Sequence, residues 1–105
     1  MKIYVIQEVH ADIDKVIAVV HENEFQQYME QRTQHYMDSL LDHISKSAPH
    51  IVASGPKAFH HSGELGSFGV ESSIQFAEDV PDDNGYSHPL KFYAFYTEME
   101  LWKPE

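Results

Sequence analysis

Apolar and β-branched residues dominate two short runs at the start of the chain. The first run covers residues 2–9, and the second, KVIAVVH, covers residues 15–21. Both runs have the composition of strands, and the polar link HADID between them is short enough for an antiparallel hairpin. Because apolar residues occur at both parities in each run, we expect part of this hairpin to be covered on both faces.

A helical periodicity follows over residues 24–46. Apolar residues recur there at spacings of three and four, which places them on one stripe with glutamine, histidine and aspartate on the opposite side. Asn23 and Gln26 have the spacing of a capping box, and Pro49 ends the pattern. The predicted stripe consists of Phe25, Met29, Tyr36, Met37, Leu40, Leu41 and Ile44.

The C-terminal part of the chain again alternates like a sheet. Residues 67–80 and 90–102 read as strands, separated by the turn-rich segment PDDNGYSHP. Residues 49–67 are predicted to be an irregular connection rich in glycine and histidine, with room for a short strand at HIVAS. The sequence therefore predicts a single α+β domain over residues 1–105. Its antiparallel sheet has four or five strands, with one long helix packed on one face, in the order β-β-α-β-β.

One helix covers only one face of such a sheet, whereas the last strand is apolar on both faces in its first half. Two arrangements would cover the second face. Either residues 49–67 fold across it and the protein is monomeric, or a second subunit packs against it. The number of aromatic residues favours a homodimer.

The charge of the chain is strongly negative, at −10 for 105 residues. Residues 64–105 contain nine acidic and two basic residues, so the C-terminal part is the acidic part. This balance argues against direct binding of nucleic acids or of anionic membranes, and it favours a protein partner, for example a basic one. The candidate partner-binding residues are Glu71, Glu78, Asp79, Asp82, Asp83, Tyr96 and Trp102. The alternative is that the negative charge only maintains solubility.

The chain contains no cysteine, no signal-peptide pattern and no long apolar run, which predicts a cytoplasmic protein without a cofactor. An alternative function is binding or sensing of zinc or another divalent metal. Its ligands would be His60, His61, Glu64 and His88. Against this, adjacent histidines on an extended chain point in opposite directions.

Three glycines, Gly63, Gly66 and Gly69, are spaced like those of a phosphate-binding loop. Their context differs, because they precede a strand rather than a helix and no lysine follows until Lys91. We expect them to permit tight turns. A small enzyme remains a further alternative, although no serine or histidine lies in a G-x-S-x-G elbow or a comparable motif.

The opening KIYVIQEVHADIDKVIAVVHENEFQQYMEQ resembles the start of small uncharacterised proteins from phages and prophages of Gram-positive bacteria. The resemblance covers residues 1–31. It implies a compact α+β accessory protein and no particular catalytic residues. Together with the charge, it predicts a small acidic, non-enzymatic interaction or regulatory protein, a phage or mobile-element accessory factor that binds a protein partner.

Overall fold

The computed structural model describes residues 1–10, 13–47, 51–76, 88–100 and 102 of the chain. Within these residues the chain forms an α+β fold with one long helix on an antiparallel sheet, as predicted, and the observed order β-β-α-β-β-β has one strand more than the predicted β-β-α-β-β. The elements are β1 (Lys2–His10), β2 (Ile13–His21), α1 (Glu22–Ser47), β3 (Ile51–His61), β4 (Leu65–Phe76) and β5 (His88–Glu100).

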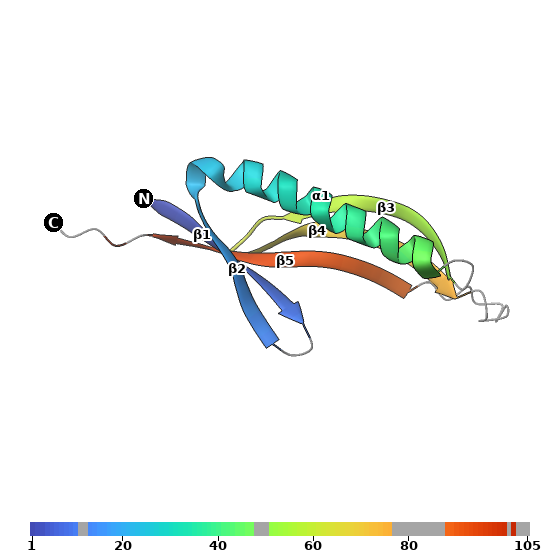
Figure 1. Ribbon diagram of the computed structural model, residues 1–105. Helices are drawn as coiled ribbons and strands as arrows, with labels where there is room; N and C mark the ends of the chain where they lie inside the picture. The colour runs from blue at the N-terminus through green and yellow to red at the C-terminus, as the bar shows by residue number, and fades with distance from the viewer. Residues whose placement is uncertain (11–12, 48–50, 77–87, 101, 103–105) are drawn as a thin grey trace.

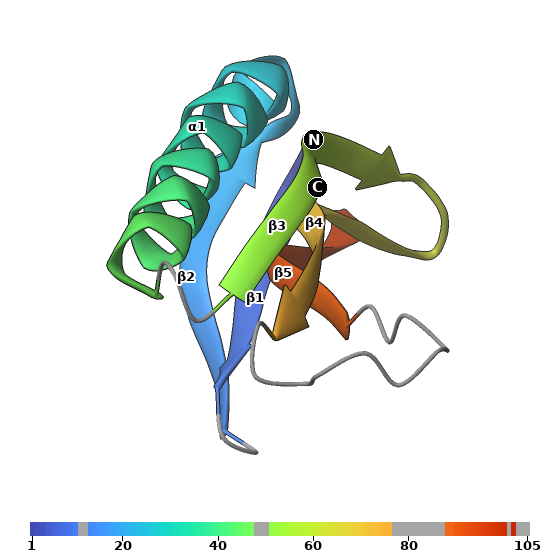
Figure 2. The same ribbon diagram turned by 90° about the vertical axis from the view of Figure 1, so that its right-hand side faces the viewer.

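All five strands form one antiparallel sheet in the order β2-β1-β5-β4-β3. The single described helix, α1, lies along one face of this sheet (Figure 1), and the end-on view shows it on one side only (Figure 2). No described helix is long and apolar enough to cross a membrane.

The central strand β5 joins two parts of the sheet. It pairs with β4 from Leu65↔Thr97 to Ile74↔His88, but with β1 only from Lys2↔Glu100 to Gln7↔Phe95. Beyond that point the β1–β2 hairpin diverges from β5, as Figure 1 shows. The long helix packs against both parts and therefore helps to hold them together.

The core lies between α1 and the sheet. Phe25, near the start of the helix, stacks on Tyr4 with 4.0 Å between ring centroids, and lies 4.8 Å from the ring of Tyr96. Residues of alternate positions on the strands complete this layer, as the two-residue period of a strand requires. The buried core consists of Ile6, Val20, Phe25, Met29, Tyr36, Leu40, Phe68, Val70, Ala94 and Tyr96.

The helix differs from the prediction at its start and at one position of the stripe. It begins at Glu22, so Asn23 lies in the first turn, where Glu22 and Glu24 interact favourably with the helix dipole. Leu41 is exposed. The buried residues of the helix are Phe25, Met29, Tyr36 and Leu40, so the buried stripe is narrower than predicted.

The prediction of an irregular connection at residues 49–67 is wrong for most of that segment. Ile51–His61 forms the strand β3 and Leu65 already begins β4, with a short turn between them. Gly55 and Pro56 are unusual strand residues, and the sheet accommodates them at an irregularity between Ser54 and Lys57, where Gly55 has a φ of 68°. An edge strand tolerates such a bulge because its outer side has no partner strand.

Candidate interaction surfaces

The sheet face opposite α1, which we call the open face, carries apolar residues on every strand and has no described helix or strand over it (Figure 2). Leu65 is 62% exposed and Val19 is 60% exposed, and they lie at the two ends of one cross-strand row that also contains Val5 and Thr97. Strand register assigns the following apolar residues to this face: Ile3, Val5, Val9, Val16, Val19, Phe59, Leu65, Tyr93, Phe95 and Met99.

Two arrangements were expected to cover the second side of the sheet, namely residues 49–67 folded across it or a second subunit. Residues 51–61 and 65–67 lie within the sheet as parts of β3 and β4, so they do not fold across it. The sequence signal for this face was the presence of apolar residues at both parities in β1, β2 and β5. The individual exposed residues on β2 and β4, such as Val19 and Leu65, were not identified from sequence.

Charged residues on the open face balance one another. Glu71 lies between two lysines of neighbouring strands, with its carboxylate oxygens 3.6 Å from Nζ of Lys57 and 3.8 Å from Nζ of Lys91. Asp14 is the other charged residue that register places on this face among the described residues. The described open face therefore has no formal net charge, in a chain whose net charge is −10.

Two of the three regularly spaced glycines, Gly66 and Gly69, leave space for aromatic residues on opposite faces of β4. At Gly66 a Cβ atom would fall inside the ring of Tyr96, which crosses β4 on the side of α1. At Gly69 a Cβ atom would collide with the backbone of Phe92 and Tyr93. On the open face, the rings of Phe59 and Tyr93 flank Gly69 from the two neighbouring strands, 6.5 Å apart. The spacing thus reflects aromatic packing across a strand, while Gly63 belongs to the β3–β4 turn.

The predicted partner-binding residues occupy different places. Glu71 lies on the open face, and Trp102 is 81% exposed just beyond β5. Tyr96, in contrast, is only 5% exposed and lies between α1 and the sheet, so its side chain is not accessible to a partner. Glu78, Asp79, Asp82 and Asp83 lie outside the described residues.

The candidate metal ligands do not form one cluster in the described part of the chain. His60 and His61 lie on opposite faces of β3, as expected for adjacent strand residues: Nε2 of His60 is 2.6 Å from the Tyr96 hydroxyl, and the ring of His61 packs on Phe59. Glu64 is exposed in the β3–β4 turn, and His88 is the first residue of β5, where its side chain is not described. Among the described residues, no group of three or more His, Asp or Glu side chains is arranged to hold a metal ion.

A buried polar cluster that sequence reasoning missed lies where β1 diverges from β5. Glu8 is 7% exposed, and one of its carboxylate oxygens accepts hydrogen bonds from Nη2 of Arg32, at 2.5 Å, and from the Tyr36 hydroxyl. The Arg32 guanidinium also lies 5.0 Å from the centroid of the Tyr36 ring. A glutamate at a helix-facing strand position is the only signal of this site in the sequence.

The cluster shifts the pKa values of its members. Burial raises the pKa of Tyr36, and the hydrogen bond to Glu8 raises it further. Burial opposes the charge of Arg32, but its hydrogen bonds to Glu8 and Tyr36 outweigh this and raise its pKa. The phenol therefore stays protonated and donates to the carboxylate, and the paired charges fix α1 against β1 rather than forming an acid or base poised near neutral pH.

The chain matches no family model, and comparison with curated proteins and with solved structures likewise finds no match. The resemblance of residues 1–31 to phage proteins therefore stays a prediction.

Proposed function

We propose that the protein is a non-enzymatic interaction protein that forms a homodimer through its open face. The observation that carries this proposal is an apolar sheet face without net charge in a chain of charge −10. Several exposed apolar side chains gathered on one face of a sheet are typical of protein–protein interaction sites.

A second copy of the chain suits this face because of its charge. Two acidic molecules repel one another wherever acidic surfaces meet, and like charges brought together cost several kcal/mol. On the open face, Lys57 and Lys91 offset Glu71 and Asp14, so two copies can approach there without this repulsion. Two sheets packed face to face would bury the apolar residues of both copies at a spacing of about 10 Å.

The test is the oligomeric state of the wild-type chain and of a charged double variant. We expect sedimentation velocity to give a dimer for the wild type and a monomer for Val19→Lys/Leu65→Lys, because both side chains are exposed in one row of the open face. Leu41→Lys is the matched control, since Leu41 is a similarly exposed leucine on α1 and its variant should stay dimeric. A wild-type chain that sediments as a monomer at every concentration contradicts the proposal.

We also propose that the acidic residues Glu78, Asp79, Asp82 and Asp83 bind a basic protein partner. Glu71 does not belong to this set, because it lies on the open face, which the dimer would bury, between Lys57 and Lys91. Binding should weaken strongly as salt is added, since exposed charges are screened within about 10 Å at 0.1 M ionic strength. Binding that neither salt nor replacement of these residues by their amides changes would exclude the acidic surface as the partner site.

A further inference from the structure

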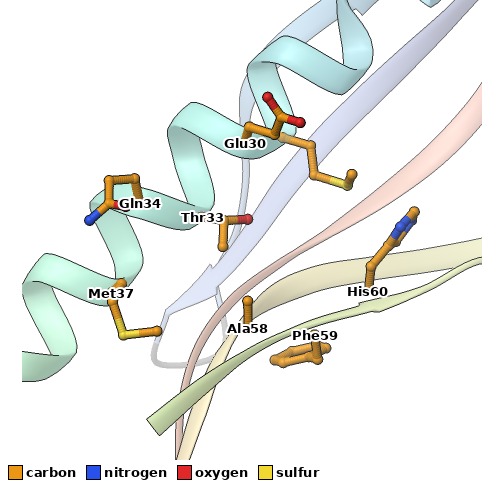
Figure 3. A pocket seen from close by; sticks show the side chains of 8 residues that line it. Glu30, Thr33, Gln34, Met37, Ala58, Phe59 and His60 are labelled. Carbon is orange, nitrogen blue, oxygen red and sulfur yellow. The ribbon is translucent and has the colours of Figure 1, made fainter.

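A groove with a volume of about 420 Å³ lies between α1 and the edge strand β3 (Figure 3). Met29, Thr33 and Met37 line it from the helix, and Ala58 and His60 line it from the strand. In Figure 3, Ala58 and His60 point towards the helix and Met37 points towards the strand, while the labelled Phe59 points to the other side of the sheet. The groove is separate from the open face, which lies on the opposite side of the sheet.

The groove exists because α1 lies beside β3 without fully covering its helix-facing residues. On β4 and β5, the helix-facing residues Val70 and Ala94 are completely buried. On β3, the helix-facing residues Ala58 and His60 are exposed. The small side chain of Ala58 leaves space beneath Met29 and Met37, and methionine adapts readily to different apolar side chains.

The backbone of β3 can also take part in binding. In the described sheet, β3 is an edge strand whose single neighbour is β4, so alternate N–H and C=O groups point outward. The residues available for pairing are Lys57–His61. Before them the strand is interrupted by the irregularity between Ser54 and Lys57, which contains Pro56, a residue without an N–H. An edge strand beside an apolar groove is the arrangement by which proteins bind extended peptides as an added strand.

Two carboxylates on α1 give the rim of the groove a negative charge. Glu30 lines the groove and accepts a hydrogen bond from Gln26, and Asp38 accepts one from Gln34, which also lines it. Both carboxylates are exposed, and in the described part of the chain neither has a lysine or arginine at ion-pair distance. A basic residue of a ligand would complement this rim.

We propose that this groove binds an extended segment of a protein partner, which pairs with Lys57–His61 as a sixth strand. The segment places an apolar side chain over Ala58 and a lysine or arginine beside Glu30 and Asp38. This inference is independent of dimer formation, because the two surfaces lie on opposite sides of the sheet.

The experiment titrates the full chain with the acetylated and amidated peptide Lys-Thr-Val-Thr-Val-Thr-Lys and follows binding by amide NMR shifts. Two further peptides carry N-methyl groups on one or the other set of alternate amides. An added strand uses only one set, so one methylated peptide should bind at least about tenfold more weakly while the other binds like the parent. Absence of binding by the parent, or equal binding by both methylated peptides, overturns the proposal.

Variants of the chain locate the binding. Ala58→Trp fills the groove and should abolish peptide binding, with circular dichroism used to verify the fold. Thr33→Arg, which blocks the groove from the helix side without changing the sheet, should have the same effect. Val19→Lys/Leu65→Lys should bind the peptide like the wild type even where it abolishes dimers. Peptide binding that is unchanged by both Ala58→Trp and Thr33→Arg overturns the proposal.

The rim charges have their own control. Glu30→Gln/Asp38→Asn should weaken binding of the lysine-flanked peptide several-fold and reduce its dependence on salt. The same variant should bind a peptide with both lysines replaced by threonine as well as the wild type does. An unchanged affinity and salt dependence for the lysine-flanked peptide overturns the role of the rim.

Discussion

The hydroxyl of Tyr96 on β5 lies 2.6 Å from Nε2 of His60 on β3, although the whole width of β4 separates the two strands. The Tyr96 ring reaches His60 by crossing β4 at Gly66, where there is no side chain. The same ring packs against Phe25 of the helix. This one residue therefore connects β3, β5 and α1.

Gly66→Ala should consequently destabilise the fold. The new methyl group would occupy the place of the Tyr96 ring, so the ring must move and lose its contacts with Phe25 and His60. Such overpacking costs about 1–3 kcal/mol in the free energy of unfolding, which urea denaturation measures. Ser73→Ala, an exposed position of the same strand, is the control and should change it by less than about 0.5 kcal/mol.

Glu8→Gln should also lower the free energy of unfolding, by about 2–3 kcal/mol. The substitution removes the charge that pairs with Arg32, whose Nε already lacks a hydrogen-bond partner in the described structure. We place the value below that of a fully buried pair because the Arg32 side chain is 28% exposed. Urea denaturation again provides the measurement.

A double variant separates the paired charges from simple burial. Glu8→Leu/Arg32→Leu removes both charges together and should be more stable than Glu8→Leu alone, because no unpaired guanidinium remains beneath the helix. If the double variant is instead less stable by the sum of the two single effects, the two residues act independently and the pair does not fix α1 against β1.

Stability should fall at alkaline pH through the buried tyrosines. Burial raises the pKa of Tyr36 and of Tyr28 above the ordinary value of 10.0, so the folded chain binds more protons than the unfolded chain above that pH. The stabilisation is complete below pH 10 and is lost as the pH rises towards the folded pKa. Tyrosinate absorbance and circular dichroism should therefore change together. In Tyr36→Phe the loss of stability above pH 10 should be shallower, and an unchanged slope would show that Tyr36 does not contribute.

Dimer formation through the open face should depend little on salt. The charged residues described there are two lysines and two carboxylates, which balance one another, and the other residues of this face are apolar or uncharged polar side chains. Sedimentation equilibrium between about 0.05 and 0.5 M salt should show less than about a threefold change in the dissociation constant, whereas an interface between acidic surfaces would strengthen markedly as salt screens its repulsion.

The hydrophobic periodicity was sufficient to predict the α+β class, the hairpin and the long helix with its stripe of Phe25, Met29, Tyr36 and Leu40. It failed at β3, because Gly55 and Pro56 have the composition of a loop and only the pairing with β4 makes the segment a strand. The Glu8 cluster and the α1–β3 groove depend on where α1 crosses the sheet. The position at which α1 crosses the sheet is determined by packing between residues that are far apart in the sequence. The hydrophobic periodicity of a single segment does not show this packing.

The position of β5 determines the order in which the sheet can be completed. β5 lies between β1 and β4 in the sheet. β1 therefore pairs with its second neighbour, β5, only when a long loop closes, since even the closest pair in sequence, Gln7 and Phe95, is separated by almost ninety residues. Closing so long a loop is entropically costly, and folds dominated by such contacts fold slowly. We therefore expect the β1–β2 and β3–β4 hairpins to form as separate early units, and docking of β5 between them to be the rate-limiting step of folding.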